Sequence, residues 1–282
     1  MSGYFKDNIS YKDRTVFSKI YVAQRGYNIL GWRDQGLIGM VLRPGTDCPI
    51  SLVGMIEHSN IDSILRIHKE LFREKLGVVK NFEHKIVLKP DAVPVVHKVR
   101  NVPMSMRSKL KQHLDKLQSE NIIEPIDSSQ WVSPIVVALK KNDELRLCVD
   151  LRSLNRNILV DCFPLPKIQD LLAQLGGAKY FTSLDLRAAY HQVELTEDSK
   201  PLTAFNTPFG AYQYLRLPFG LASAASLFQK LMFKVLGSIQ GVIAYQDDIL
   251  VYSENIRMHL TILNQVLTAL KEHGFTLKKR KM

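Results

Sequence analysis

The feature that most constrains this chain is a pair of adjacent aspartates between two short apolar runs. Val242–Tyr245 and Ile249–Tyr252 have the composition of β-strands, and only Gln246, Asp247 and Asp248 separate them. The chain must therefore reverse tightly, which predicts a β-hairpin with two acids at its tip. A single Asp in a turn commonly makes local hydrogen bonds. Two adjacent carboxylates repel each other, and because a fold tolerates that repulsion best beside a cation, the pair indicates a metal site.

A third acid stands at the end of another apolar run. Tyr180–Leu186 is typical of a strand, and Phe181, Ser183 and Asp185 share one of its faces because side chains alternate. If this strand lies beside the hairpin, the three acids converge into a site for two Mg²⁺ ions roughly 4 Å apart. The chemistry indicated is nucleotidyl transfer, which needs positioning and charge neutralisation rather than a nucleophilic side chain. No GxxxxGKS or GxxxxGKT phosphate loop occurs in the sequence.

Helical and strand patterns alternate along the rest of the chain, so the fold class is α+β. Apolar stripes predict helices over Pro103–Asn121 and Ile256–Leu270, and a shorter amphipathic stretch over Asp62–Phe72. Ser223 as a cap and Gly237 at the end predict a further helix that runs to about Leu236. Two apolar strands flanking the basic turn Lys140–Glu144 predict a second hairpin. The remaining predicted strands are Val16–Val22, a short run within residues 24–32, Val132–Leu139, Leu145–Leu151, Leu202–Phe205 and Tyr212–Leu215.

Composition narrows the function classes. The chain has 282 residues, 46% of them hydrophobic, which is enough for a globular core. A formal net charge of +11 suits a polyanionic partner, because neutralising phosphates releases counterions. Three cysteines without metal-type spacing argue against a disulfide scaffold or a zinc ribbon. No run approaches the roughly 20 apolar residues of a membrane span, and the start lacks the order of a secretory signal, so we expect an intracellular protein without a membrane partner.

Three sequence blocks in this order and spacing resemble successive palm motifs of gypsy-type long-terminal-repeat retrotransposon polymerases. The blocks are Leu184–Gln192, Leu217–Gln229 and Tyr245–Asp248, and the resemblance covers roughly Phe82 to the end. It implies a reverse transcriptase with the fingers and palm of a right-hand polymerase, in which helices back an antiparallel sheet. The implied reaction is RNA-directed DNA synthesis, in which a two-metal site adds dNTPs to a primer 3′-hydroxyl.

The resemblance also implies roles for single residues. Asp185, Asp247 and Asp248 match the catalytic acids, and together with Leu186 they match the residues that hold two Mg²⁺ ions, with Mn²⁺ as a substitute. Tyr190 stands where the family places an aromatic ring under the incoming sugar, so that a 2′-hydroxyl would clash.

Further matched positions lie around the nucleotide and the template. Phe219 and Gly220 match the hinge segment that supports the nucleotide, where Gly lets the backbone approach closely. Gln229 resembles a template-side position, although an ordinary solvated Gln would read the same. Lys141 and Arg146 resemble the fingers residues that grip the β- and γ-phosphates, for which Arg supplies a bidentate contact and Lys a point charge.

Other positions depart from the family pattern or play a structural part in it. Asp150 and Arg152 match residues that chiefly pair with each other. Gln246 is polar where the family commonly has Ile, Val or Met, and the fingers tip Asn142–Glu144 lacks the customary Gly and is more acidic.

The N-terminal stretch resembles a different protein. Tyr27–Trp32 is similar to the C-terminal strand of a retropepsin-type protease, but no Asp-Thr-Gly or Asp-Ser-Gly loop occurs in the chain. We therefore expect three parts: a small β remnant of such a protease over residues 1–47, a linker over 48–92, and fingers and palm over 93–282. The chain stops at Met282, before a primer-gripping hairpin, a thumb or a ribonuclease H domain would begin, so a truncated polymerase is expected.

The expected partners are an RNA or DNA template, a DNA or tRNA-type primer, dNTPs and the rest of a Pol polyprotein. The expected location is cytoplasmic, in virus-like particles, with the nucleus as a second compartment. One alternative is a catalytically inactive relic or co-opted nucleic-acid-binding module. Another is an RNA-templated RNA polymerase, against which Tyr190 and the absence of Gly before Asp247 both count.

Overall fold

The computed structural model of this chain forms two compact units, residues 1–60 and 61–282. In the first unit it describes the backbone of three strands and the start of one helix. In the second unit it describes residues 61–139, 145–161 and 163–278 with their side chains.

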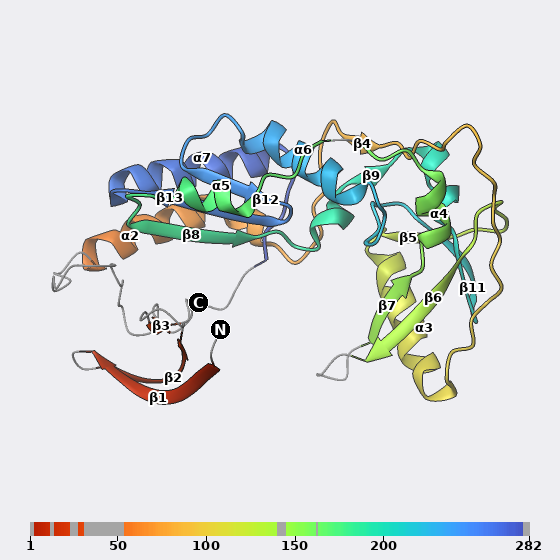
Figure 1. Cartoon of the computed structure of the whole chain (residues 1–282), viewed down its shortest axis with the longest axis horizontal. Helices are drawn as coiled ribbons and strands as arrows, with labels where there is room; N and C mark the ends of the chain where they lie inside the picture. The colour runs from red at the N-terminus through yellow and green to blue at the C-terminus, as the bar shows by residue number, and fades with distance from the viewer. Residues whose placement is uncertain are drawn as a thin grey trace. The chain divides into compact units, whose positions relative to one another are not determined.

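The N-terminal unit contains a three-stranded antiparallel sheet (red in Figure 1). Strand β1 (Gly3–Tyr11) pairs with β2 (Arg14–Val22), and β3 (Asn28–Leu30) pairs with the other edge of β2. The two strands predicted around the Gly26 turn are confirmed as β2 and β3. Strand β1 was not predicted, because Lys, Asp and Asn interrupt its apolar residues.

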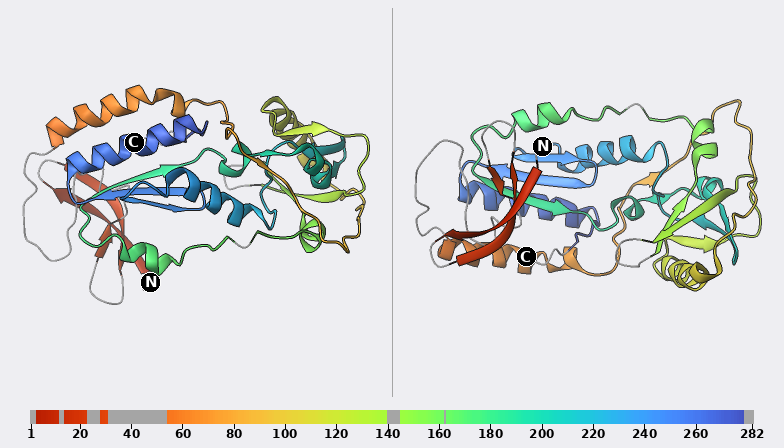
Figure 2. Two further views of the ribbon diagram at one scale, coloured as in Figure 1. Left: turned by 90° about the horizontal axis from the view of Figure 1, so that it is seen from above. Right: turned by 60° about the horizontal axis from the view of Figure 1, so that its bottom comes forward.

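The sheet that holds the acids is three-stranded, antiparallel and ordered β12–β13–β8. Its strands are β12 (Val242–Tyr245), β13 (Asp248–Ser253) and β8 (Tyr180–Asp185). Helix α7 (Ile256–Glu272) contacts β13 and β8, and α6 (Ala224–Leu236) contacts β12 and α7 (Figure 2). This sheet backed by helices is the predicted palm.

Both palm helices are confirmed, but the side chain of Ser223 makes no capping hydrogen bond to α6. The stripe of α7 is buried, and the Asn255 side chain caps its first turn by accepting a hydrogen bond from the Met258 backbone N–H at 2.9 Å. The helix is followed by Gly274, whose φ of +80° favours glycine, and a Cβ there would lie 2.1 Å from the Val78 carbonyl oxygen. The segment after α7 therefore packs closely against the chain around Val78.

A five-stranded sheet, ordered β5–β11–β10–β6–β7, forms the fingers. The predicted hairpin is confirmed as β6 and β7, whose register ends at Leu139 opposite Leu145, and its tip at residues 140–144 lies outside the described residues. The predicted helix is confirmed as α3 (Met104–Ser119), which contacts β7 and β5. Within this sheet, strands β10 and β6 pair in parallel and the other pairs of strands are antiparallel. The five strands are β5 (Ile123–Pro125), β11 (Gly210–Tyr214), β10 (Phe205–Thr207), β6 (Ser133–Leu139) and β7 (Leu145–Val149).

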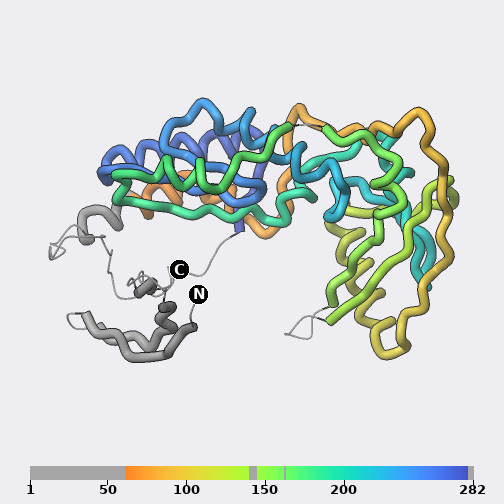
Figure 3. The backbone as a smooth tube through the Cα atoms, in the orientation of Figure 1, coloured from red at the N-terminus to blue at the C-terminus, as the bar shows by residue number. Residues whose placement is uncertain are grey.

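The segment that precedes the fingers packs into the same core as the palm. Helix α2 (Gly54–Ile67) and η1 (Lys69–Phe72) confirm the amphipathic stretch, and Leu71, Val79 and Ile86 are buried with the palm residues. Figure 3 shows this segment running alongside both subdomains. The second compact unit thus begins at residue 61, and the three-part division at 47 and 92 stays a prediction.

Short elements connect the two sheets. Strand β4 (Glu83–His84) pairs in parallel with β9 (Glu194–Leu195). Across the described part of the chain, no helix has the length and apolar character needed to cross a membrane. The other short helices are α4 (Arg152–Asn157), α5 (Ile168–Ala173), η2 (Ala189–Gln192), η3 (Glu197–Ser199) and η4 (Pro201–Thr203).

Candidate active site

The predicted acidic hairpin is present, and its turn has an unusual backbone. Tyr245 pairs with Asp248, which leaves Gln246 and Asp247 as a two-residue turn. Gln246 has φ +54° whereas Asp247 does not have a positive φ, a combination that fits a type II′ turn. Glycine is the usual residue at the first central position of that turn, so Gln246 occupies a left-handed conformation that costs energy.

The strand register brings the third acid to the same end of the sheet. Asp185 on β8 lies directly opposite Asp248 on β13. Opposite residues of an antiparallel pair point to one face, with Cβ atoms about 5 Å apart. Asp247 occupies the adjacent turn position. The prediction that the strand of Asp185 lies beside the acidic hairpin is therefore confirmed.

The acids sit beside the segment that follows α7. Lys278 donates a backbone hydrogen bond to the Asp185 carbonyl at 2.8 Å, and its Nζ lies 3.8 Å from Asp185 Oδ2. Leu186 is buried and forms an isolated β-bridge with Leu277. The two backbone hydrogen bonds beside this bridge run from Arg187 to the Thr276 carbonyl and from Lys278 to the Asp185 carbonyl, so neither uses the Leu186 carbonyl. Sequence reasoning missed Lys278, because nothing in a run of lysines and arginines marks the one that meets an acid.

The carboxylates offer the hard oxygen ligands that divalent cations prefer. Within residues 61–139, 145–161 and 163–278, no three acidic, His or Cys side chains are gathered tightly enough to ligate one ion. The backbone register brings the three carboxylates to one end of the sheet. The residues present therefore fit a divalent metal ion.

Tyr190 and Phe219 pack together next to the acids. Their ring centroids are 5.1 Å apart, and Tyr190 also meets the buried Phe228 edge to face at 5.3 Å. Burial raises the pKa of the Tyr190 phenol, and the negative charge of Asp247 raises it further. Tyr190 is therefore a neutral, half-buried ring close enough to Asp247 to feel its charge. Its position under an incoming sugar stays a prediction.

The hinge segment after Phe219 is held by a residue that sequence reasoning did not single out. Gly220 has φ +87°, so glycine is needed there for its backbone conformation. The Asn155 side chain of α4 donates to the Gly220 carbonyl and accepts from the Ala222 N–H, both at 2.9 Å. His191 supports Phe219 from the other side, with ring centroids 4.9 Å apart.

The structure places Gln229 inside the protein and not on a solvated surface. Its side chain is 5% exposed, donates to the Ala244 carbonyl at 2.9 Å and accepts from the Gln246 N–H at 2.8 Å. These two bonds join the side-chain amide to the acidic hairpin. A template-side role for Gln229 stays a prediction.

Of the two fingers residues predicted to contact phosphates, the structure describes only Arg146. Lys141 lies outside the described residues. Arg146 is exposed on β7, which belongs to the fingers sheet and not to the sheet of the acids. The predicted pairing of Asp150 with Arg152 is confirmed by two bonds of 2.8 and 2.7 Å, and the bonds from Arg152 hold the pKa of Asp150 well below its usual range, with a further contribution from Arg100.

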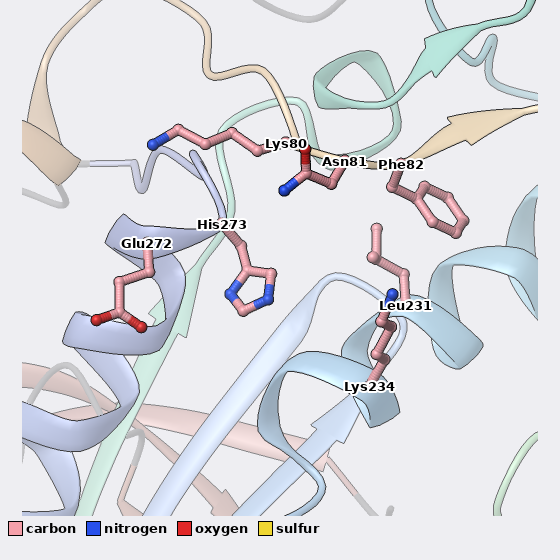
Figure 4. Close-up of a pocket in the computed structure, with 7 residues that line it drawn as sticks. All are labelled: Lys80, Asn81, Phe82, Leu231, Lys234, Glu272 and His273. Atoms are coloured by element: carbon pink, nitrogen blue, oxygen red, sulfur yellow. The ribbon is translucent and has the colours of Figure 1, made fainter.

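Two cavities of the described unit lie away from the acids. One, of about 260 Å³, lies between the start of β4, α6 and the end of α7, and no predicted site residue lines it (Figure 4). The other, of about 670 Å³, lies at the far end of the β12–β13 hairpin, around Gly241 and Ser253. Asp248 is exposed, and Asp185 and Asp247 are partly exposed.

The two sheets, the acidic hairpin and the aromatic pair define the fingers and palm of a right-hand polymerase. Residues 138–282, just over half of the chain, match the family model described as reverse transcriptase (RNA-dependent DNA polymerase). This chain belongs to the reverse transcriptase family.

Relatives carry the same indication. Over 234 residues the chain is 35% identical to the retrovirus-related Pol polyprotein from transposon 412 of Drosophila melanogaster, covering 79% of this chain and 19% of the relative. It is also 35% identical over 199 residues to that from transposon gypsy of the same organism, covering 68% of this chain and 19% of the relative. The chain thus spans about a fifth of the length of these relatives.

Solved structures support the fold. The foamy viral protease-reverse transcriptase in complex with RNA/DNA hybrid matches with a TM-score of 0.74 and 21% identity, covering 98% of this chain and 39% of that chain. Its complex with dsDNA matches with a TM-score of 0.68 and 24% identity, covering 80% and 46%.

Proposed function

We propose that this chain is the fingers and palm of a retrotransposon RNA-directed DNA polymerase, which adds dNTPs to a primer 3′-hydroxyl. The observation that carries the proposal is the register of the palm sheet, which sets Asp185 opposite Asp248 with Asp247 at the adjoining turn. A structural hairpin has no need of three acids at one sheet end, where their mutual repulsion is unfavourable. Nucleotidyl transfer needs them.

Reverse transcriptases in general use divalent metal ions. We propose two Mg²⁺ ions, with Mn²⁺ as a substitute, held by the side chains of Asp185, Asp247 and Asp248 and by the backbone of Leu186. Bound ions of this kind activate the primer hydroxyl and neutralise the triphosphate. Lys278, whose ammonium lies 3.8 Å from the Asp185 carboxylate, offsets part of the negative charge at this sheet end.

Around the acids, the aromatic residues select and seat the nucleotide in this proposal. Tyr190 is wedged between Phe219 and Phe228, so its ring cannot easily move aside for a 2′-hydroxyl. Phe219 and Gly220 lie under the nucleotide and support it. Lys141 and Arg146 of the fingers neutralise the charge of its phosphates. The Tyr190 gate favours DNA over RNA synthesis.

The proposed partners are an RNA or DNA template, a DNA or tRNA-type primer, dNTPs and other parts of a Pol polyprotein. The net charge of +11 and the nucleic-acid complexes of the foamy viral protein support the first two. Kinship with Pol polyproteins supports a location in cytoplasmic virus-like particles and in the nucleus. It also supports dividing the chain into a protease-like end at 1–47, a linker at 48–92 and the polymerase at 93–282.

Primer extension tests the proposal. With Mg²⁺, a poly-adenylate template and an oligo-dT primer, the wild type should extend the primer, and Asp247→Asn should lose about 10³-fold or more of the rate, because each catalytic carboxylate acts on the transition state. Asp170→Asn removes the same charge from an exposed position on α5 and should leave extension unchanged. Equal rates for wild type and Asp247→Asn would refute the assigned acids.

The same assay separates the second candidate, a nucleic-acid-binding module without catalysis. If the chain is such a module, fluorescence anisotropy should show that it binds the primer-template. Neither the wild type nor any variant should then extend the primer. Extension with ribonucleotides as fast as with deoxyribonucleotides would instead favour an RNA polymerase.

A further inference from the structure

We infer that Gln229 is a positioning residue for catalysis: its side-chain amide holds the Tyr245–Asp248 turn in the conformation that sets Asp247 and Asp248 beside Asp185. This inference rests on the proposed function, since it names the residue that keeps the proposed catalytic acids in place. Gln229 itself does not touch the reacting atoms.

The two hydrogen bonds of Gln229 bracket the turn. Its Nε2 donates to the Ala244 carbonyl at 2.9 Å, and its Oε1 accepts from the Gln246 N–H at 2.8 Å. One side chain therefore holds a backbone acceptor and a backbone donor two residues apart, on either side of Tyr245. A displacement of the turn in either direction lengthens one of the two bonds.

The helix that carries Gln229 cannot follow such a displacement. Its neighbours Phe228 and Leu231 are buried in the core, with exposed fractions of 0% and 2%. Helix α6 also packs against β12, the strand that leads into the turn. Gln229 is therefore a fixed point against which the hairpin tip is held.

The turn needs such a fixed point, because its backbone is strained. Gln246 adopts φ +54°, a left-handed conformation that non-glycine residues keep only where the surroundings impose it. Gln246 immediately precedes Asp247, so relaxation of its φ would swing the direction of the Asp247 side chain. The bond from Gln229 acts on the N–H of this strained residue.

Only a neutral amide satisfies both sides of this contact. A carboxylate of the same size accepts from the Gln246 N–H but has no donor for the Ala244 carbonyl, and it adds a negative charge near three acids. A methionine fills the same buried volume and bonds neither group. Asn is one methylene shorter and cannot span both bonds without moving the turn.

Kinetics of matched variants test the inference. Gln229→Met should lower kcat by about tenfold to hundredfold, the cost of misplacing a catalytic group by a fraction of an ångström to an ångström. The KM for dNTP and the Kd for primer-template should stay within about twofold of wild type, because Gln229 faces neither ligand. Gln240→Met changes an exposed Gln just before β12 and should leave all three constants unchanged. A raised Kd with unchanged kcat would overturn the inference in favour of a template contact.

A rescue experiment separates positioning from a loss of folding. Gln246→Gly places the preferred residue at the first position of a type II′ turn, because glycine adopts a positive φ without strain. Combined with Gln229→Met, it should restore kcat at least severalfold. Absence of any rescue in a double variant that melts at the wild-type temperature would contradict the role assigned to the strained turn.

A measurement without activity completes the test. The Gln246 amide should exchange slowly with deuterium in the wild type and at least tenfold faster in Gln229→Met, and Mn²⁺ should bind that variant more weakly. If the wild type does not extend primers while Gln246 exchange accelerates as expected, the proposed function fails and the contact that holds the turn stands. Extension by the wild type with unchanged Gln246 exchange in Gln229→Met would refute the inference alone.

Discussion

At the scale of single residues, the proposed function needs side chains that touch the reacting groups and neutral side chains that hold the backbone around them. In this proposal Tyr190 belongs to the first group. Its ring is fixed by Phe219 and Phe228, and its hydroxyl stays protonated because burial and the Asp247 charge raise its pKa. The proposed contact with a sugar therefore depends on the ring and not on a charge.

This dependence gives a prediction for sugar selection. Tyr190→Ala should raise the incorporation of ribonucleotides relative to deoxyribonucleotides by about tenfold to 200-fold, the range expected when a pocket loses a steric contact. Tyr190→Phe retains the ring and should retain the selectivity. The ratio of kcat/KM for rUTP and dTTP measures the effect, and an unchanged ratio in Tyr190→Ala would exclude the gate.

At the scale of elements, the palm hairpin and the hinge segment are each held by one amide from a neighbouring helix. Gln229 of α6 holds the carbonyl of Ala244 and the N–H of Gln246, and Asn155 of α4 holds the carbonyl of Gly220 and the N–H of Ala222. In both cases the bonded groups are two residues apart. The helices thus help to fix the shape of two turns.

The hinge contact predicts a change in nucleotide binding. Asn155→Ala should raise the KM for dNTP about fivefold to tenfold, since each lost hydrogen bond costs about 1 kcal/mol. Asn157→Ala is the matched control, because this residue of the same helix also makes two amide bonds, to Ser153 and Val93, and does not touch the hinge. A KM that rises equally in both variants would show that α4 is merely destabilised.

How far the sequence predicts these elements depends on the range of the interactions. The β12–β13 hairpin and the α7 stripe are local patterns and were predicted close to their observed bounds. The parallel pairing of β10 with β6 joins segments about seventy residues apart, and no local pattern specifies it. The partners of Gln229 and Asn155 were not predicted for the same reason, because a polar side chain gives no sign of which distant backbone group it meets.

At the scale of the whole molecule, the pH dependence of stability involves two histidines, of which His84 is buried and His191 is half-buried. His84 bonds the Ser223 hydroxyl at 3.0 Å, and His191 meets the Leu217 carbonyl at 3.2 Å. Burial lowers the pKa of each to about 4, against 6.5 for an unperturbed histidine. Both side chains are therefore neutral in the folded protein at neutral pH.

Linkage then sets the pH dependence of stability. Because the folded pKa lies below the unfolded pKa, the stabilisation is fully present above pH 6.5 and is lost as the pH falls toward 4. Each histidine should contribute on the order of 3 kcal/mol to this loss. Urea unfolding at pH 7 and pH 4.5 should show the decrease, and the double variant His84→Gln and His191→Gln should show a smaller one. An equal decrease in both proteins would assign the acid sensitivity to other groups.

The long-range register of the palm sheet also has a consequence for the order of folding during synthesis. Asp185 leaves the ribosome well before Asp248, and β8 has no partner in its sheet until β13 has been made. Domains emerge at roughly 5–20 residues per second, so β8 exposes unpaired backbone for several seconds. The fingers hairpin, whose strands are neighbours in sequence, can close during that time. The three acids are thus brought together among the last steps of folding, and the proposed site does not exist in a nascent chain until its palm is complete.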